Sequence, residues 1–412
     1  MRSSNRVHGS GRSVSLVYIS SGLMDADAFT SLCRKLGWVD VDIAAYSANS
    51  EVLDASEEAF SEAVEAVRAA DLVVLRMHGG SVYFRKYGRL MDVVVSKGIP
   101  AMICSGSADE LEGEASRALF PYPDTEYSLL HDFIDIGGER NLTGLVLWAC
   151  RTFAGMDVGV PEAEVPRAQG IYRPGDVRGF KEEAYLRSLD SSKPTVAVMF
   201  HQAQWLRGTT AHIDALVREI ERKGAQTIPV FFTSGENGKL GSTGLRGAVR
   251  KYLLKGGRPR VQAVVMCMGF SQAAMAGGPG NVFGMLGVPV LQAPAVYRSS
   301  RDWEDDTAGL SPQEVSMGAI QTELDGQIST APLQFMEPHG DRFSVCTVPD
   351  RVTAVADSAL AWCRLSKLPR GDVRVAVLLD MPTSGSLGAC RGLDTMNSLC
   401  RLMSRLSDEG YS

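Results

Sequence analysis

The chain repeats one pattern along most of its length: a short, continuously apolar segment, a loop that contains glycine, and an amphipathic stretch. The apolar segments are rich in valine and isoleucine and do not alternate with polar residues, which is typical of strands buried on both faces of a parallel sheet. Alternating strands and helices predict a doubly wound α/β architecture with right-handed crossovers. The predicted strands are Val14–Ser20, Val39–Ala45, Leu72–Met77, Ile99–Cys104, Thr195–Phe200, Thr227–Phe232, Val261–Met268 and Val288–Gln292.

The clearest predicted helix runs from about Thr210 to Lys223. Its apolar residues recur at the spacing of one helix face, so a single stripe can pack against a sheet. This stripe consists of Ile213, Leu216, Val217 and Ile220. A similar helix is predicted over Ser56–Ala70, directly before the strand Leu72–Met77.

Breaks in the pattern predict two doubly wound domains of the Rossmann or flavodoxin type. Between them the prolines Pro161, Pro166, Pro174 and Pro194 indicate a connection with little regular structure. The predicted divisions are a disordered leader (1–12), a first α/β domain (13–156), a linker (157–194) and a second α/β domain (195–366).

A further unit is predicted at residues 372–412. It would begin with the strand Val373–Leu379 and continue, after a turn, into a helix from about Leu393. One strand and one helix cannot bury a sheet. We therefore expect this unit either to dock on the preceding domain or to be the start of a third, truncated domain.

Composition excludes several classes of protein. The 412 residues carry a net charge of −6 without a long basic block, whereas proteins that bind nucleic acid through counterion release are normally basic. No apolar run approaches the roughly 18–20 residues that a membrane-spanning helix requires. The eight cysteines are scattered without a Cys-x-x-Cys pair, which is typical of reduced thiols. We therefore expect a cytoplasmic protein that binds neither nucleic acid nor a membrane.

Three histidines stand near the ends of predicted strands, at the edge where open α/β sheets bind ligands. His78 directly follows one strand and is succeeded by Gly79 and Gly80, while His201 follows another strand. His212 lies in the first turn of the next helix and would approach His201 if the loop is tight. Two imidazoles at one junction could coordinate a metal or polarise a ligand. For each histidine alone, a hydrogen bond to the backbone is the simpler interpretation.

Carboxylates offer a second candidate site. Glu323 lies in the segment Gln321–Gly326, between a helical stretch and a glycine turn, and could accept a proton or hold a hard cation. A purely structural role is the alternative. The polar loop Ser234–Ser242 lacks the spacing of a phosphate-binding loop, so the chain shows no nucleotide site of its own.

Several short segments form a specific pattern through their order and spacing. They are Leu75–Gly80, Tyr87–Gly88, Gly137–Leu142, Gln169–Tyr172, Asp214–Leu216, Pro229–Phe231, Val288–Gln292, Gly309–Pro312, Glu323–Gly326, Gly392–Asp394 and Gly410–Tyr411. On these segments, from about Asp71 to Tyr411, the chain resembles the N-terminal portion of the large (CobN-type) subunit of cobaltochelatase. That subunit belongs to a superfamily with the porphyrin-binding H subunit of magnesium chelatase.

The resemblance implies insertion of Co²⁺, as the substrate metal, into hydrogenobyrinic acid a,c-diamide during cobalamin biosynthesis. In this family the large subunit binds the tetrapyrrole and the metal, while separate AAA+ ATPase subunits hydrolyse ATP, in agreement with the missing phosphate loop. Two other readings stay open: magnesium-chelatase-like metalation of a protoporphyrin, and a non-catalytic tetrapyrrole-binding or scaffold protein. The segments around Arg76 and Gly137–Leu142 favour the cobalt branch over the magnesium branch.

The resemblance also ranks the candidate residues. Glu323 matches a carboxylate in the family's Pro-Glu-Leu-Asp-Gly segment and is the first candidate for base or metal relay, with Asp325 second. Thr322 replaces the family's proline there. His201 is a weaker candidate for binding the ligand and the metal, because its position in the family is usually not histidine. The remaining predicted ligand-binding residues are His78, Gly79, Gly80, His212 and Gln292, of which His78 and His212 stand where relatives usually carry other residues.

The family's subunits are more than twice as long as this chain, and their C-terminal part contributes to the ligand cavity. The resemblance therefore predicts that the isolated chain lacks full chelatase activity. It would be a truncated form, a fragment or one half of a split subunit, with the C-terminal part possible on a separate chain.

Overall fold

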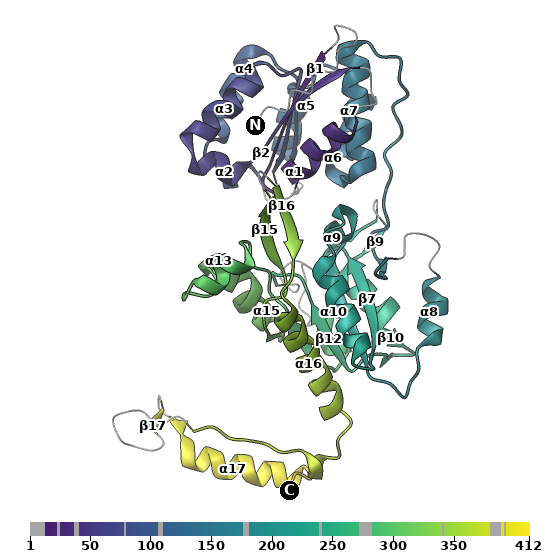
Figure 1. The fold of residues 1–412 in the computed structure, drawn as a ribbon, viewed down its shortest axis with the longest axis vertical. Coiled ribbons are helices and arrows are strands. Elements are labelled where there is room, and N and C mark those ends of the chain that lie inside the picture. The colour runs from purple at the N-terminus through teal and green to yellow at the C-terminus, as the bar shows by residue number, and fades with distance from the viewer. Residues whose placement is uncertain are drawn as a thin grey trace.

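The computed structural model describes residues 13–412 except for gaps at 23–24, 37–40, 78–79, 106–109, 176–180, 239–240, 272–281, 340–341, 380–388 and 391–392. Two α/β lobes, one above the other in Figure 1, are joined by a long extended segment, and a C-terminal helix lies apart from both. The predicted leader lies outside the described residues. Within the described residues, no helix has the length and apolarity that crossing a membrane requires.

The first lobe (residues 13–154) is built on a four-stranded parallel sheet in the order β2-β1-β3-β4. Helices cover both faces of this sheet, as predicted (Figure 1). Its strands are β1 (Ser13–Ser20), β2 (Asp42–Asn49), β3 (Leu72–Met77) and β4 (Ala101–Ser105). Its helices are α1 (Asp25–Lys35), α2 (Ser50–Ala55), α3 (Glu57–Arg68), α4 (Tyr87–Lys97), α5 (Glu110–Ala118), α6 (Asp124–Ile136) and α7 (Glu139–Ala154), with a 3₁₀ turn η1 (Ser81–Tyr83).

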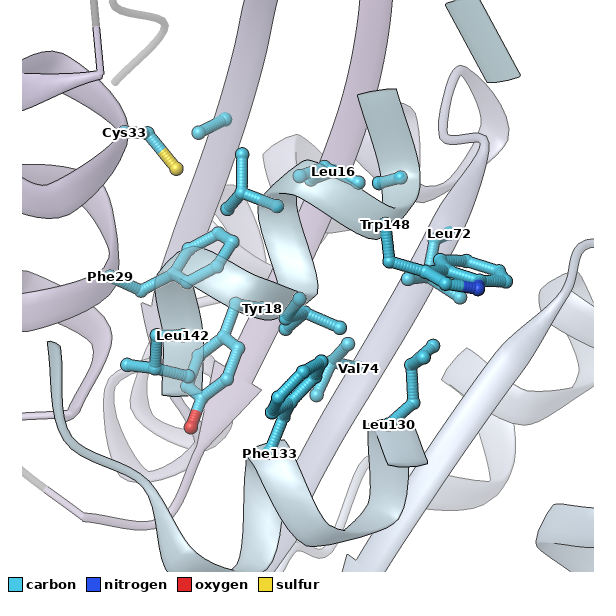
Figure 2. Packing of buried hydrophobic residues seen from close by; sticks show 14 of the residues in the cluster. Leu16, Tyr18, Phe29, Cys33, Leu72, Val74, Leu130, Phe133, Leu142 and Trp148 are labelled. Carbon is cyan, nitrogen blue, oxygen red and sulfur yellow. The ribbon is translucent and has the colours of Figure 1, made fainter. Parts of the chain in front are cut away.

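Strand β1 shows why these strands are apolar on both faces. Leu16 and Tyr18 pack with α1, α6 and α7, whereas Val17 and Ile19 belong to the core beneath α2, α3 and α4. Figure 2 shows the first of these cores, where the Tyr18 and Phe29 rings stack with centroids 4.7 Å apart. Because alternate residues of one strand enter different cores, the strand has no polar face.

A glycine in α7 makes close packing in this core possible. A Cβ atom on Gly144 would lie 2.5 Å from Cζ of Phe133. We expect Gly144→Ala to destabilise the lobe by about 1–3 kcal/mol through overpacking, despite alanine's higher helix propensity. Urea unfolding measures the change. The matched control is Gly88→Ala in α4, where a Cβ meets no atom within 4 Å; equal stability of the two variants would contradict this packing.

The second lobe (residues 170–366) contains a six-stranded sheet in the order β14-β13-β12-β6-β7-β5. All neighbours in it are parallel except the edge pair β5–β7. Helices α10 and α16 cover one face, and α11 with the π-helical turn η2 covers the other. The strands are β5 (Gly170–Ile171), β6 (Thr195–His201), β7 (Gln226–Phe232), β12 (Ala263–Met266), β13 (Val290–Gln292) and β14 (Ile328–Ser329).

Shorter elements complete this lobe, and one hairpin reaches from it toward the first lobe (Figure 1). The hairpins are β8 (Glu236–Asn237) with β9 (Ser242–Thr243), β10 (Leu254–Lys255) with β11 (Arg258–Pro259), and the reaching pair β15 (Phe335–His339) with β16 (Arg342–Cys346). The helices are α8 (Glu182–Ser188), α9 (Gln202–Arg207), α10 (Ala211–Arg222), α11 (Gly244–Ala248), η2 (Val249–Leu253), η3 (Val282–Met285), α13 (Ser300–Asp305), α14 (Pro312–Val315), η4 (Ser316–Ile320), α15 (Gln321–Leu324) and α16 (Pro349–Leu365).

Edge strand β5 holds the connecting segment against this sheet. The Tyr172 N–H donates to the Pro229 carbonyl at 2.8 Å, and the Tyr172 hydroxyl donates to Asp214 Oδ1 at 2.7 Å. A Cβ on Gly170 would lie 2.8 Å from Cζ of Phe231, so glycine is needed where β5 crosses β7. The segment that was predicted to have little regular structure therefore contains an edge strand and helix α8. The prolines around them gave no indication of either element.

The C-terminal segment differs from its prediction. Residues Val373–Leu379 are extended but belong to no sheet, and Leu378 is 95% exposed, so the predicted strand is wrong. A strand needs a neighbour to pair with its backbone groups, and none of the described residues provides one here. The remaining elements are η5 (Arg370–Asp372), the short pair β17 (Ala389–Cys390) and β18 (Leu393–Asp394), and α17 (Thr395–Asp408), whose start agrees with the predicted helix.

Candidate ligand-binding cleft between the lobes

A cleft of about 640 Å³ lies between the two lobes. The first lobe contributes the carboxyl ends of β1 and β3, helix α1 and the turn between α6 and α7. The second lobe contributes the end of β6, helix α9, and Ser344 and Val345 of β16. The carboxyl edges of two parallel sheets therefore meet at one cavity, which is where open α/β folds bind ligands.

Asp25 is the buried centre of a charged cluster in this cleft. It begins α1, its side chain is 4% exposed, and Ser20 Oγ donates to its Oδ2 at 3.0 Å. Arg76, from β3, lies 3.3 Å from the same oxygen. Arg207, from α9 of the second lobe, pairs with Oδ1. One carboxylate thus joins a guanidinium group from each lobe.

Arg76 is held in place from several sides. Its Nη2 donates to the Asp135 carbonyl at 3.1 Å, and a Cβ on Gly137 would lie 3.4 Å from its Nη1. Burial lowers the pKa of Arg76, but the charge of Asp25 and the hydrogen bond to Tyr18 outweigh this and leave the pKa raised. Burial raises the pKa of Tyr18 to about 12, so its hydroxyl stays protonated at the cleft wall.

The Gly137-Gly138 turn has a backbone that only glycine adopts readily. Its residues have φ angles of 67° and 87°, and α7 begins directly after them. Asn141 donates to the Gly137 carbonyl at 2.8 Å and to the Glu164 carbonyl at 2.9 Å, and its Oδ1 accepts from the Glu164 N–H at 2.8 Å. The side-chain amide of Asn141 therefore links the turn to the connecting segment through hydrogen bonds.

His201 is the one predicted site residue, among those the structure describes, that lines the cleft. It ends β6 and caps α9, and its Nδ1 accepts from the Ala203 N–H at 3.1 Å. The neutral ring consequently carries its proton on Nε2. In this conformation His201 can donate a hydrogen bond to a ligand, whereas ligation of a metal through Nε2 would require the other tautomer and loss of the cap.

His212 and Gln292 are buried away from the cleft. The His212 side chain is 1% exposed, and neither ring nitrogen has a hydrogen-bond partner among the described residues. Burial lowers the pKa of His212 to about 3. Gln292 ends β13 and is fully buried, and its backbone carbonyl accepts from Thr330. The expected approach of two imidazoles at the ligand is not seen, because α10 turns His212 into the core beneath it.

The Glu323 segment also lies outside the cleft lining. Glu323 is exposed and accepts from Ser329 Oγ at 2.8 Å, whereas Asp325 is 6% exposed and accepts from Ser271 Oγ at 2.8 Å. Glu323 lies in the short helix α15, and Asp325 follows it, next to β14. The two carboxylates therefore occupy different environments, and neither contributes to the described cleft.

The remaining predicted residues add little to the site. His78 and Gly79 lie outside the described residues, while Gly80 is buried, has a φ of 94° and does not line the cleft. Across the described residues, no group of three or more His, Cys, Asp or Glu side chains is arranged to hold a metal ion.

Sequence reasoning missed Asp25 and Arg207, the pair that joins the lobes. Asp25 follows β1 and Arg207 follows β6, at the same strand ends that drew attention to His201. The rule that ligands bind at the carboxyl ends of strands could have identified both. Their pairing could not be predicted, because it depends on how the two lobes face each other.

A family model for CobN/magnesium chelatase matches residues 131–412, more than half of the chain. The chain belongs to this family. Aerobic cobaltochelatase subunit CobN of Pseudomonas aeruginosa is 26% identical over 356 residues, covering 84% of this chain and 28% of that protein. The chloroplastic magnesium-chelatase subunit ChlH of Oryza sativa subsp. indica is 26% identical over 236 residues, covering 54% of this chain and 16% of that protein.

A solved structure has the same fold. The catalytic subunit of cobaltochelatase from Mycobacterium tuberculosis superposes with a TM-score of 0.55 at 24% identity, covering 98% of this chain and 31% of that one. The chain therefore spans less than a third of the length of each of these relatives.

Some of the segments that carry the family resemblance form two groups in the structure. Gln169–Tyr172, Asp214–Leu216 and Pro229–Phe231 contact one another at the β5 edge of the second lobe. Arg76 and Gly137–Leu142 instead contribute to the cleft.

Proposed function

We propose that this chain forms part of the tetrapyrrole-binding subunit of a metal chelatase, with the macrocycle held between the two lobes. The inserted metal would be Co²⁺ and the acceptor hydrogenobyrinic acid a,c-diamide. ATP would be hydrolysed by separate AAA+ subunits, and the remainder of the large subunit would complete the ligand cavity. This places the chain in cobalamin biosynthesis.

The observation that carries the proposal is the cleft itself. Its volume of about 640 Å³ is within the range of about 300–1,000 Å³ typical of small-molecule sites. Apolar walls from Leu32, Leu142 and Leu206 suit the faces of a flat macrocycle, while Arg76 and Arg207 suit its peripheral carboxylates.

Metal insertion also needs a proton acceptor, because the macrocycle loses its inner N–H protons as the metal binds. Asp27 and Asp135 line the cleft and are candidates for this task. Glu323 is exposed outside the cleft, so its proposed role is narrower: passing the ion on from solvent.

The binding step is tested by absorbance titration of the purified chain with metal-free hydrogenobyrinic acid a,c-diamide and, separately, with protoporphyrin. We expect a saturable spectral change with the corrinoid at lower concentrations than with the porphyrin. Preference for the porphyrin would assign the chain to the magnesium branch, which the similarity to the rice ChlH subunit keeps open. Binding of neither ring would contradict the proposal.

The catalytic step is tested in the complete assembly, with the rest of the large subunit and the ATPase subunits supplied. Glu323→Gln is expected to leave corrinoid affinity unchanged and to slow Co²⁺ insertion by about 10²-fold or more if it relays the metal. Asp27→Asn is the matched carboxylate variant inside the cleft. Normal Co²⁺ insertion by Glu323→Gln together with slow insertion by Asp27→Asn would assign the catalytic role to the cleft carboxylate. Corrinoid binding without metal insertion by the wild-type assembly would favour a non-catalytic scaffold protein.

A further inference from the structure

Two guanidinium groups from different lobes meet at the cleft wall. Arg76 comes from the sheet of the first lobe and Arg207 from α9 of the second, and both pair with the carboxylate of Asp25. The side chain of Asp25 is 4% exposed, whereas those of Arg76 and Arg207 are 18% and 30% exposed. The two guanidinium groups are therefore more accessible from the cleft than the carboxylate between them.

Both guanidinium groups retain hydrogen-bonding capacity. A guanidinium has five N–H donors in a planar fork that matches a carboxylate. Within the described residues, the side chain of Arg207 makes one hydrogen bond, to Asp25. The side chain of Arg76 bonds to Asp25, to the Asp135 carbonyl and to the Tyr18 hydroxyl. The third basic side chain of the cleft, Lys35, is already paired with Glu139 at 3.1 Å.

We propose that Arg207 and Arg76 bind one peripheral carboxylate of the tetrapyrrole. This inference rests on the proposed function and specifies the orientation of the ring, with a carboxylate-bearing edge against β3 and α9. Charge-assisted, forked hydrogen bonds make such a contact selective for an ionised carboxylate over its ester. The same ligand group also bridges the lobes, since it contacts one arginine from each.

The test is a titration of wild type and Arg207→Ala with metal-free hydrogenobyrinic acid a,c-diamide and with its methyl ester. We expect Arg207→Ala to weaken binding of the free acid by about 10- to 100-fold, the effect of losing hydrogen bonds to a charged group, and to leave ester affinity within about twofold. Arg151→Ala is the matched control, because it breaks an ion pair with Glu126 on the first lobe outside the cleft lining.

A second variant separates ligand contact from lobe closure. Asp25→Asn removes the charge that pairs with Arg207 but keeps both guanidinium groups, so we expect it to bind the free acid at least as tightly as wild type. Equal weakening of acid and ester by Arg207→Ala, or weakening by Asp25→Asn to the same extent, would show that the ion pair only holds the lobes and would overturn the inference. If Arg207→Ala binds the free acid as tightly as wild type does, the inference is also overturned. If wild type binds neither the free acid nor the ester, the proposed function is contradicted instead.

Discussion

Replacing Asp25 by alanine is expected to lower the free energy of unfolding of the first lobe by about 3–5 kcal/mol, the usual cost of removing one partner of a buried ion pair. Arg76 is only 18% exposed and would keep its charge, because a guanidinium group stays protonated in proteins. Ser20 Oγ would lose its acceptor at the same time. The variant therefore leaves a buried cation without its carboxylate, which is worse than the loss of one hydrogen bond.

Urea unfolding followed by far-ultraviolet circular dichroism measures this change, with the first-lobe transition analysed separately because the two lobes need not unfold together. Asp124→Ala is the control, because Asp124 is 87% exposed and its ion pair with Arg117 should contribute at most about 1 kcal/mol. If the two variants lose similar stability, Asp25 is not the buried centre of a charge cluster.

The second lobe is expected to lose about 2 kcal/mol of stability between pH 7.5 and pH 5, and His212→Leu is expected to abolish that loss. Burial lowers the pKa of His212 to about 3, against 6.5 for an ordinary histidine. Above pH 6.5 the ring is neutral in both folded and unfolded chains and has no effect on pH dependence. Below it the unfolded chain gains a proton that the folded lobe cannot accept, so stability falls by about 1.4 kcal/mol per pH unit until about pH 3.

Urea unfolding of wild type and His212→Leu at pH 7.5 and pH 5 measures how much of the pH-dependent loss of stability comes from His212. Leucine is of similar size and removes two ring nitrogens that have no hydrogen-bond partner, so this variant should also be at least as stable as wild type at pH 7.5. Leu216→Ala in the same helix is the control: it should lose the same stability at both pH values. A pH dependence that survives in His212→Leu would contradict the burial of this imidazole.

Most of the predicted strands and both predicted helices of the two lobes agree with the structure, although β2 is Asp42–Asn49 where Val39–Ala45 was predicted. β3 begins and ends where the valine-rich run predicts, and α10 differs from its predicted bounds by one residue at each end. Long-range pairing was harder to predict. The edge strand Gly170–Ile171 has two residues and depends on β7, while Val373–Leu379 has strand composition but no described neighbour to pair with. Local composition indicates that a strand can form, but it forms only where a neighbouring strand is present to pair with it.

The candidate site was only partly predictable for the same reason. His201 could be placed at the cleft because position after a strand is a local property. His212 is eleven residues further along and is buried in the core, because a helix directs neighbouring side chains to different faces. Asp25 and Arg207 are separated by 182 positions, and no sequence pattern links them. The interface between the lobes had to be seen before the cluster could be recognised.

The central claim is that the cleft between the lobes holds the macrocycle. A crystal structure of the chain with metal-free hydrogenobyrinic acid a,c-diamide tests it most directly. We expect the ring between the Gly137–Leu142 turn and the His201–Ala211 segment, with one carboxylate on Arg207. A ring bound elsewhere, for example against Glu323, with the Asp25–Arg207 pair intact and the cleft empty, would contradict the account.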